Sequence, residues 1–131
     1  MKIRELFDQK TVFSFEVFPP KKTSSIDTVY KTLEELEGLT PDFISVTFSA
    51  GGSGNSALAL DIASKIKEGN AVEPMIHLPC INYSKNEISE VLAELDKRGI
   101  ENILALRGDI NPDIPPKKEF CYASDLVSFI R

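Results

Sequence analysis

The fold is decided by residues 74–106, which read PMIHLPCINYSKNEISEVLAELDKRGIENILAL. The stretch starts and ends with short apolar runs, residues 74–78 and 103–106, that are typical of buried strands. Between them Ser84 and Glu87 have the spacing of a capping box, and an apolar stripe at helical spacing follows: Ile88, Val91, Leu92 and Leu95. Strand, helix and strand in this order predict a parallel pair joined by a right-handed crossover.

The same alternation extends over the rest of the chain. Further strands are expected at residues 12–18 and 43–48, and further helices at 26–36, 55–67 and 124–130. Ser24 or Ser25 can cap the first of these helices, and Gly69 ends the second. The chain therefore contains about four strand–helix units, which predicts an α/β fold with helices covering a parallel sheet.

Length and composition indicate one globular domain over residues 1–131. The chain has a mass of 14.5 kDa, with 42% hydrophobic and 27% charged residues. A closed (β/α)8 barrel usually needs about 250 residues, so four units amount to half of one. Two architectures remain open at this point. One is an open sheet of flavodoxin type, and the other is a barrel fragment whose edge strands stay unpaired unless another copy covers them.

Charge and targeting features exclude several classes of partner. A formal net charge of -5 and a pI of about 4.9 argue against nucleic acid and anionic membranes. Charged residues near the start and the lack of a long apolar run predict a cytoplasmic protein with no membrane contact. Cys80 and Cys121 are far apart in a chain with one histidine, so we expect inert or buried thiols, with neither a disulfide framework nor a metal site.

One polar residue falls near the carboxyl end of each expected strand: Glu16, Thr47, His77 and Arg107. They are spaced by 31, 30 and 30 positions, which matches the strand–helix period. Alternation along the strands predicts that Leu106 and the other apolar neighbours point the opposite way. We therefore expect four polar groups on one rim, at the end of the sheet where parallel α/β folds bind ligands.

Each of these residues also has an ordinary structural interpretation. Glu16 lies in an aromatic strand, where partial desolvation suits a carboxyl to proton transfer, but taken alone such a residue is more often a glutamate paired with a buried arginine. His77 and Thr47 taken singly are common core and strand residues, and Arg107 begins a Gly-Asp turn. The glycine-rich residues 51–54 lack the ending of a P-loop, so they are a weak phosphate signal.

Five motifs in order resemble the methylenetetrahydrofolate reductase family. They are Phe15-Glu16-Val17-Phe18-Pro19-Pro20, Ser45-Val46-Thr47-Phe48, His77-Leu78-Pro79-Cys80, Leu106-Arg107-Gly108-Asp109 and Tyr122-Ala123-Ser124-Asp125-Leu126-Val127. The resemblance runs from about residue 10 to the last residue. It implies a flavin-binding (β/α)8 barrel, of which this chain would be the first half, in place of the open sheet. An unrelated open α/β binding protein would require all five motifs to be coincidences.

The resemblance also implies a reaction. In that family hydride passes from NADH or NADPH to FAD, and from reduced FAD to 5,10-methylenetetrahydrofolate, giving 5-methyltetrahydrofolate. By carry-over Glu16 is the general acid that protonates the folate, and Asp109 lies near flavin and folate, where its charge stabilises the cationic intermediate. The residues expected to contact flavin are Thr47, Phe48, Ala50, His77, Arg107, Gly108, Asp109 and Tyr122.

Two departures from the family pattern qualify these expectations. Phe48 stands where some relatives carry tyrosine, so a hydroxyl contact is absent while ring packing can persist. Family barrels run to nearly twice this length, so we expect little or no reductase activity from the chain unless it is completed. The alternative is a non-catalytic half-barrel that binds flavin or folate weakly and self-associates as a homo-oligomer through its strand edges.

Overall fold

Four parallel strands form one sheet in the computed structural model, which describes residues 1–21, 24–48, 55–69 and 72–131. The strands pair in sequence order, β1-β2-β3-β4. Their bounds are Ser14–Val17 for β1, Phe43–Val46 for β2, Glu73–Pro79 for β3 and Asn102–Leu106 for β4. All four strands expected from the sequence are confirmed as parallel strands, with ends that differ by at most two residues.

The expected helices are confirmed as well. They are α2 (Ile26–Glu37), α3 (Asn55–Glu68), α4 (Lys85–Lys97) and α5 (Ala123–Ile130), and none of the described helices is long and apolar enough to cross a membrane. The capping box of α4 is formed, because the Glu87 amide donates to Ser84 Oγ at 3.1 Å and the Ser84 amide donates to Glu87 Oε2 at 2.7 Å. Ser25 caps α2 by accepting from the Asp27 amide at 3.2 Å.

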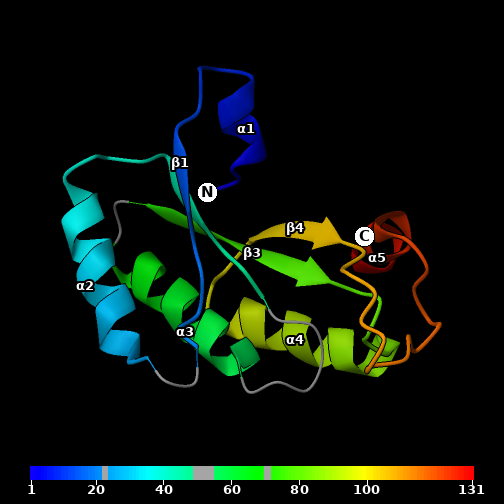
Figure 1. Ribbon diagram of the computed structural model, residues 1–131. Helices are drawn as coiled ribbons and strands as arrows, with labels where there is room; N and C mark the ends of the chain where they lie inside the picture. Colours follow the sequence, from blue (N-terminus) through cyan, green and yellow to red (C-terminus); the bar gives the residue numbers. More distant parts are fainter. Residues whose placement is uncertain (22–23, 49–54, 70–71) are drawn as a thin grey trace.

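A short helix that the sequence analysis did not anticipate, α1 (Arg4–Phe7), precedes β1 (Figure 1). Its position is fixed by the buried Asn102 side chain, which lies at the start of β4. Asn102 Oδ1 accepts from the Ile3 amide at 2.9 Å, and Nδ2 donates to the Met1 carbonyl at 2.9 Å. This amide side chain therefore ties the first residues to the amino end of the sheet.

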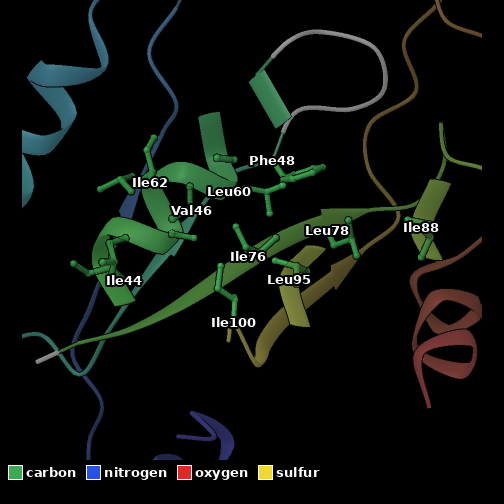
Figure 2. Close-up of a cluster of buried hydrophobic side chains, with 14 of the residues drawn as sticks. Ile44, Val46, Phe48, Leu60, Ile62, Ile76, Leu78, Ile88, Leu95 and Ile100 are labelled. Atoms are coloured by element: carbon green, nitrogen blue, oxygen red, sulfur yellow. The ribbon is translucent and has the colours of Figure 1, made fainter. Parts of the chain in front are cut away.

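The core lies between one face of the sheet and the helices. On the strands it takes alternate residues, including Ile44, Val46, Ile76 and Leu78, and on the other side it takes residues of α2, α3, α4 and α5. Figure 2 shows these strand side chains against Leu60, Ile62, Ile88 and Leu95. Helices from all four units thus cover the same face of the sheet.

Sequential strand order with the helices on one face is the arrangement of consecutive units in a (β/α)8 barrel. A flavodoxin-like sheet places its second strand outside its first and has helices on both faces. The chain is therefore an α/β fold that matches a partial barrel of the TIM type.

The expectation that every strand is buried is wrong for the two edge strands. All four residues of β2 are buried, whereas Ser14 and Glu16 of β1 and Leu104 of β4 are exposed. The physical reason is position, because β1 and β4 each pair on one side only. The face opposite the core, here called the open face, is packed by α1 near the amino ends of the strands, where the Phe7 ring lies 6.5 Å from that of Phe43.

Truncating a core residue tests this packing. Ile76 is fully buried between the sheet and the helices, so Ile76→Ala should lower the free energy of unfolding by about 2–5 kcal/mol, because it leaves a cavity. Urea denaturation followed by circular dichroism measures the change. Leu39→Ala, at an exposed position, is the control and should change stability by less than about 0.5 kcal/mol. Equal losses in both variants would contradict the assigned core.

Candidate active site

The open face of the sheet, opposite the core, carries candidate polar residues. The register pairs Glu16 with Ser45 and Ser45 with Met75, so these residues share a face, and two positions further along β3 lies His77 on the same face. The core residues Val17, Val46 and Ile76 lie in the neighbouring row, which faces the helices. Two of the motif residues are thereby brought to the carboxyl half of the open face.

Glu16 and His77 meet across the intervening strand. Glu16 Oε2 lies 3.5 Å from His77 Nε2, although β1 and β3 do not pair with each other. The His77 side chain is 14% exposed and that of Glu16 is 47% exposed, because Glu16 stands on the edge strand. The contact places a carboxylate against an imidazole, a combination able to hold and exchange a proton. The alternative of a buried glutamate–arginine pair is not what the structure has.

Thr47 and Phe48 follow β2 and lie in different environments. The Thr47 amide donates to the Val17 carbonyl at 3.1 Å, which extends the β1–β2 pairing by one bond and keeps Thr47 beside the Glu16–His77 pair. Phe48 is 6% exposed, belongs to the core and has its ring 6.3 Å from that of Tyr83 at an interplanar angle of 46°. Phe48 is therefore mainly a residue of the hydrophobic core.

Arg107 does not occupy the place that the spacing predicted. His77 pairs with Leu104 and Pro79 with Leu106, so the leucines share the face of His77, and the expectation that Leu106 points the opposite way is wrong. Arg107 lies beyond β4, is exposed, and its Nε donates to the Gly108 carbonyl at 3.2 Å. The reason is register: the β3–β4 offset is 27 positions, whereas the spacing from His77 to Arg107 is 30.

The turn at Gly108 is fastened to the end of β3. The Arg107 carbonyl accepts from the amides of Cys80 at 3.1 Å and Ile81 at 2.8 Å. Gly108 has φ +89°, and a Cβ there would lie 2.9 Å from Pro79 Cβ and 3.2 Å from Ile81 Cγ2. Only glycine fits both the backbone angle and the space. This tight contact sets the position of the connection that carries Asp109.

Tyr122 is held at the same strand end from another direction. The buried Cys80 thiol donates to the Tyr122 carbonyl at 3.6 Å, and Asp125 Oδ2 accepts from the amides of Cys121 at 2.9 Å and Tyr122 at 2.8 Å. The Tyr122 side chain is left 67% exposed. The end of β3 is thus the common support of His77, of the Gly108 turn and of Tyr122.

The two cysteines differ in environment. Burial raises the pKa of the Cys80 thiol, so it stays protonated near neutral pH and unreactive, as the sequence led us to expect. Cys121 is exposed, so of the two expected states, buried or inert, burial does not apply to it and inertness stays a prediction.

Two expected site residues are not joined to the others. Asp109 is exposed and, within the described part of the chain, makes no hydrogen bond or ion pair. Ala50 and the glycine-rich residues 51–54 lie outside the described residues. The structure therefore brings Glu16, His77 and Thr47 to one face of the sheet. It separately holds the Gly108 turn and Tyr122 at the end of β3 by hydrogen bonds.

Comparison with known proteins gives the family. The family model described as methylenetetrahydrofolate reductase matches residues 2–131. The chain belongs to the methylenetetrahydrofolate reductase family.

Individual members of the methylenetetrahydrofolate reductase family agree with this match. A protein of Oryza sativa subsp. japonica named probable methylenetetrahydrofolate reductase (NADH) is 38% identical over 95% of this chain and 21% of its own length. A 5,10-methylenetetrahydrofolate reductase of Pectobacterium carotovorum is 37% identical over 90% of the chain and 39% of its own length. The chain thus spans between about a fifth and two fifths of these reductases.

Two buried polar residues, one on β2 and one after β3, escaped the sequence analysis. Asn82, in the connection from β3 to α4, is 3% exposed and neither polar atom of its side chain has a hydrogen-bond partner among the described residues. Ser45, one strand from Glu16, is 5% exposed and lies on the face opposite the core. The polar–apolar–polar alternation Ser45-Val46-Thr47 could have placed Ser45 on the same face as Thr47. No local sequence pattern marks the Asn82 side chain as lacking a hydrogen-bond partner.

Substituting Gly108 tests the turn that supports the site. Gly108→Ala should lower the free energy of unfolding by about 1–3 kcal/mol, because an L side chain is strained at that φ and meets Pro79. Gly38→Ala is a matched control, since Gly38 has φ -63° and open space around it, and it should be neutral or stabilise by up to about 1 kcal/mol. The denaturant midpoints of both variants measure these changes. A Gly108→Ala variant as stable as the wild type would contradict the close approach of residue 108 to Pro79.

Proposed function

We propose that this chain is the first part of a flavin-dependent oxidoreductase that reduces 5,10-methylenetetrahydrofolate to 5-methyltetrahydrofolate, with NADH or NADPH as hydride donor. The observation that carries the proposal is the contact between Glu16 Oε2 and His77 Nε2. These residues come from separate family motifs, and they meet on the open face toward the carboxyl ends of the strands, where barrel enzymes place their chemistry.

FAD is the proposed cofactor, and the residues present suit it. A buried side-chain amide without a partner is costly, and Asn82 offers two donors and one acceptor near the ligand-binding end of β3. A flavin ring presents both acceptors and a donor along one edge, so it can satisfy groups of this kind. FAD, when bound, supplies hydride transfer between the nicotinamide donor and the folate.

The residues proposed to hold FAD are those of the rim and its support. Thr47 and His77 line the open face, and the Gly108 turn and Tyr122 are fixed to the end of β3. Arg107 and Asp109 are exposed beside that turn, so their charges are free to reach a ligand. Phe48, which is 6% exposed, and Ala50 complete the proposed contacts.

Glu16 is proposed as the general acid. Its carboxyl is half exposed on the open face, so a substrate nitrogen can approach it, while His77 holds one carboxyl oxygen. A protonated Glu16 gives its proton to the folate and is left as a carboxylate next to an imidazole that can stabilise it. Asp109 is proposed to balance the positive charge that the protonated folate carries.

The same open face explains why the chain alone should have little or no reductase activity. Both β1 and β4 are edge strands, and the Glu16 side chain is 47% exposed to solvent. Water then competes with every polar contact at the site and weakens its electrostatic effect. The remainder of a reductase would cover this face and contribute further ligand contacts.

A second candidate function is a non-catalytic half-barrel that self-associates. Strand edges with unpaired backbone groups readily pair with another copy. Apolar side chains accompany the edges, since Phe18 after β1 is 65% exposed and Leu104 of β4 is 39% exposed. A homo-oligomer would cover these groups.

Glu16→Gln in a full-length reductase containing this segment tests the catalytic assignment. Folate reduction should fall by about 100- to 10,000-fold, because the acid that protonates the folate is lost, while reduction of the flavin by NADH persists. Stopped-flow measurement of the two half-reactions separates them. Equal loss in both half-reactions would show that Glu16 has a structural role instead.

Sedimentation velocity of the chain alone tests self-association. The weight-average sedimentation coefficient should rise with concentration across the micromolar range, because the open face and the edges become covered. Leu104→Lys should reduce this rise, since it puts a charge on the open face, whereas Leu39→Lys, exposed at the end of α2, should not. A strictly monomeric wild-type chain would argue against this second candidate.

A further inference from the structure

The contact between Glu16 and His77 spans a larger gap than a neighbouring-strand contact. Adjacent strands lie about 4.8 Å apart, so residues on β1 and β3 start from backbones separated by about 10 Å. The two side chains close this gap to 3.5 Å between Oε2 and Nε2. They can do so only if β2 places nothing bulky on the open face between them.

The residues of β2 and its end that face this gap are small. Glu16 is directly beside Ser45, and His77 is one row further, so the line between them crosses β2 between Ser45 and Thr47. Ser45 is 5% exposed, so little free space remains around its side chain on the face that carries Glu16 and His77. A longer side chain at position 45 would occupy the space through which Glu16 reaches the imidazole.

We propose that Ser45 is a positioning residue of the site, because its small side chain leaves the gap through which Glu16 is held against His77. The inference rests on the proposed function for its catalytic meaning, since it assigns to Ser45 the orientation of the general acid. With Oε2 facing Nε2, the carboxyl keeps one oxygen on the imidazole, while its other oxygen makes no hydrogen bond within the described part of the chain. In the described part of the chain neither residue makes a second ion pair that could orient it instead.

The space rather than the hydroxyl of Ser45 is the feature that matters. In the described part of the chain no hydrogen bond from Ser45 to Glu16 or His77 is formed, so the hydroxyl does not carry the contact. Ser45→Ala should therefore preserve the pair, whereas Ser45→Leu should separate it. These two variants differ in volume and are both uncharged, which makes them a matched pair.

The single histidine of the chain gives a direct test without cofactor or substrate. Long-range ¹H–¹⁵N spectra, recorded at the same alkaline pH for every variant, show which ring nitrogen of His77 carries the proton. The wild type and Ser45→Ala should show mainly the form protonated on Nε2, facing Glu16. Glu16→Ala and Ser45→Leu should show a mixture of the two forms, with His77 signals shifted alike.

Two results would overturn the proposal. If Glu16→Ala leaves the His77 signals unchanged, the pair does not orient the ring. If Glu16→Ala changes the His77 signals but Ser45→Leu keeps those of the wild type, the small side chain at position 45 is not needed for the pair. Dispersed backbone amide signals verify that each variant is folded. Ser45→Val, whose β-branched side chain suits a strand, repeats the test with less added volume if Ser45→Leu does not fold.

The readout also separates this inference from the proposed function. Loss of flavin binding or of folate reduction would not alter the His77 spectra of the free chain. Conversely, if the chain binds FAD but Ser45→Leu has no effect on the His77 signals, the proposed function stands and the proposed role of Ser45 is wrong.

Discussion

The structure depends on one constraint: a sequentially ordered parallel sheet must send every crossover helix to the same face. The core between that face and α2, α3, α4 and α5 holds the four units together. The opposite face is left for the polar residues, and Glu16 and His77 lie on it toward the carboxyl ends of the strands. The division between a covered face that provides stability and an open face that provides chemistry follows directly from strand order.

The site is organised around β2 and β3, the two central strands. Ser45 and Thr47 keep the path across β2 open, so that an edge-strand carboxyl reaches a central-strand imidazole. The end of β3 supports the rest, through the glycine-specific turn at Gly108 and the thiol contact from Cys80 to Tyr122. Rigid central strands thus position groups that stand on exposed edges and loops.

Much of this arrangement could be predicted from the sequence. Capping residues, apolar stripes and β-branched runs located every strand and every helix except α1, whose four residues carry no periodic signal and whose position depends on the distant Asn102. The order of the five sequence motifs predicted the methylenetetrahydrofolate reductase family. Strand register could not be predicted, because a repeat of 30 positions does not fix the offset between neighbouring strands, and this is why Arg107 and Leu106 were misplaced. The exposure of Glu16 depends on β1 being an edge, which no local pattern encodes.

The central claim is that FAD binds on the open face beside Glu16 and His77, and the single histidine reports on it directly. FAD is titrated into the chain while the His77 ring signals are followed by NMR. The account predicts that these signals shift progressively with FAD concentration, while signals of core residues such as Ile76 and Leu95, on the covered side of the sheet, change little. His77 signals that stay unchanged up to millimolar FAD, in a chain whose amide spectrum shows it to be folded, would contradict the account.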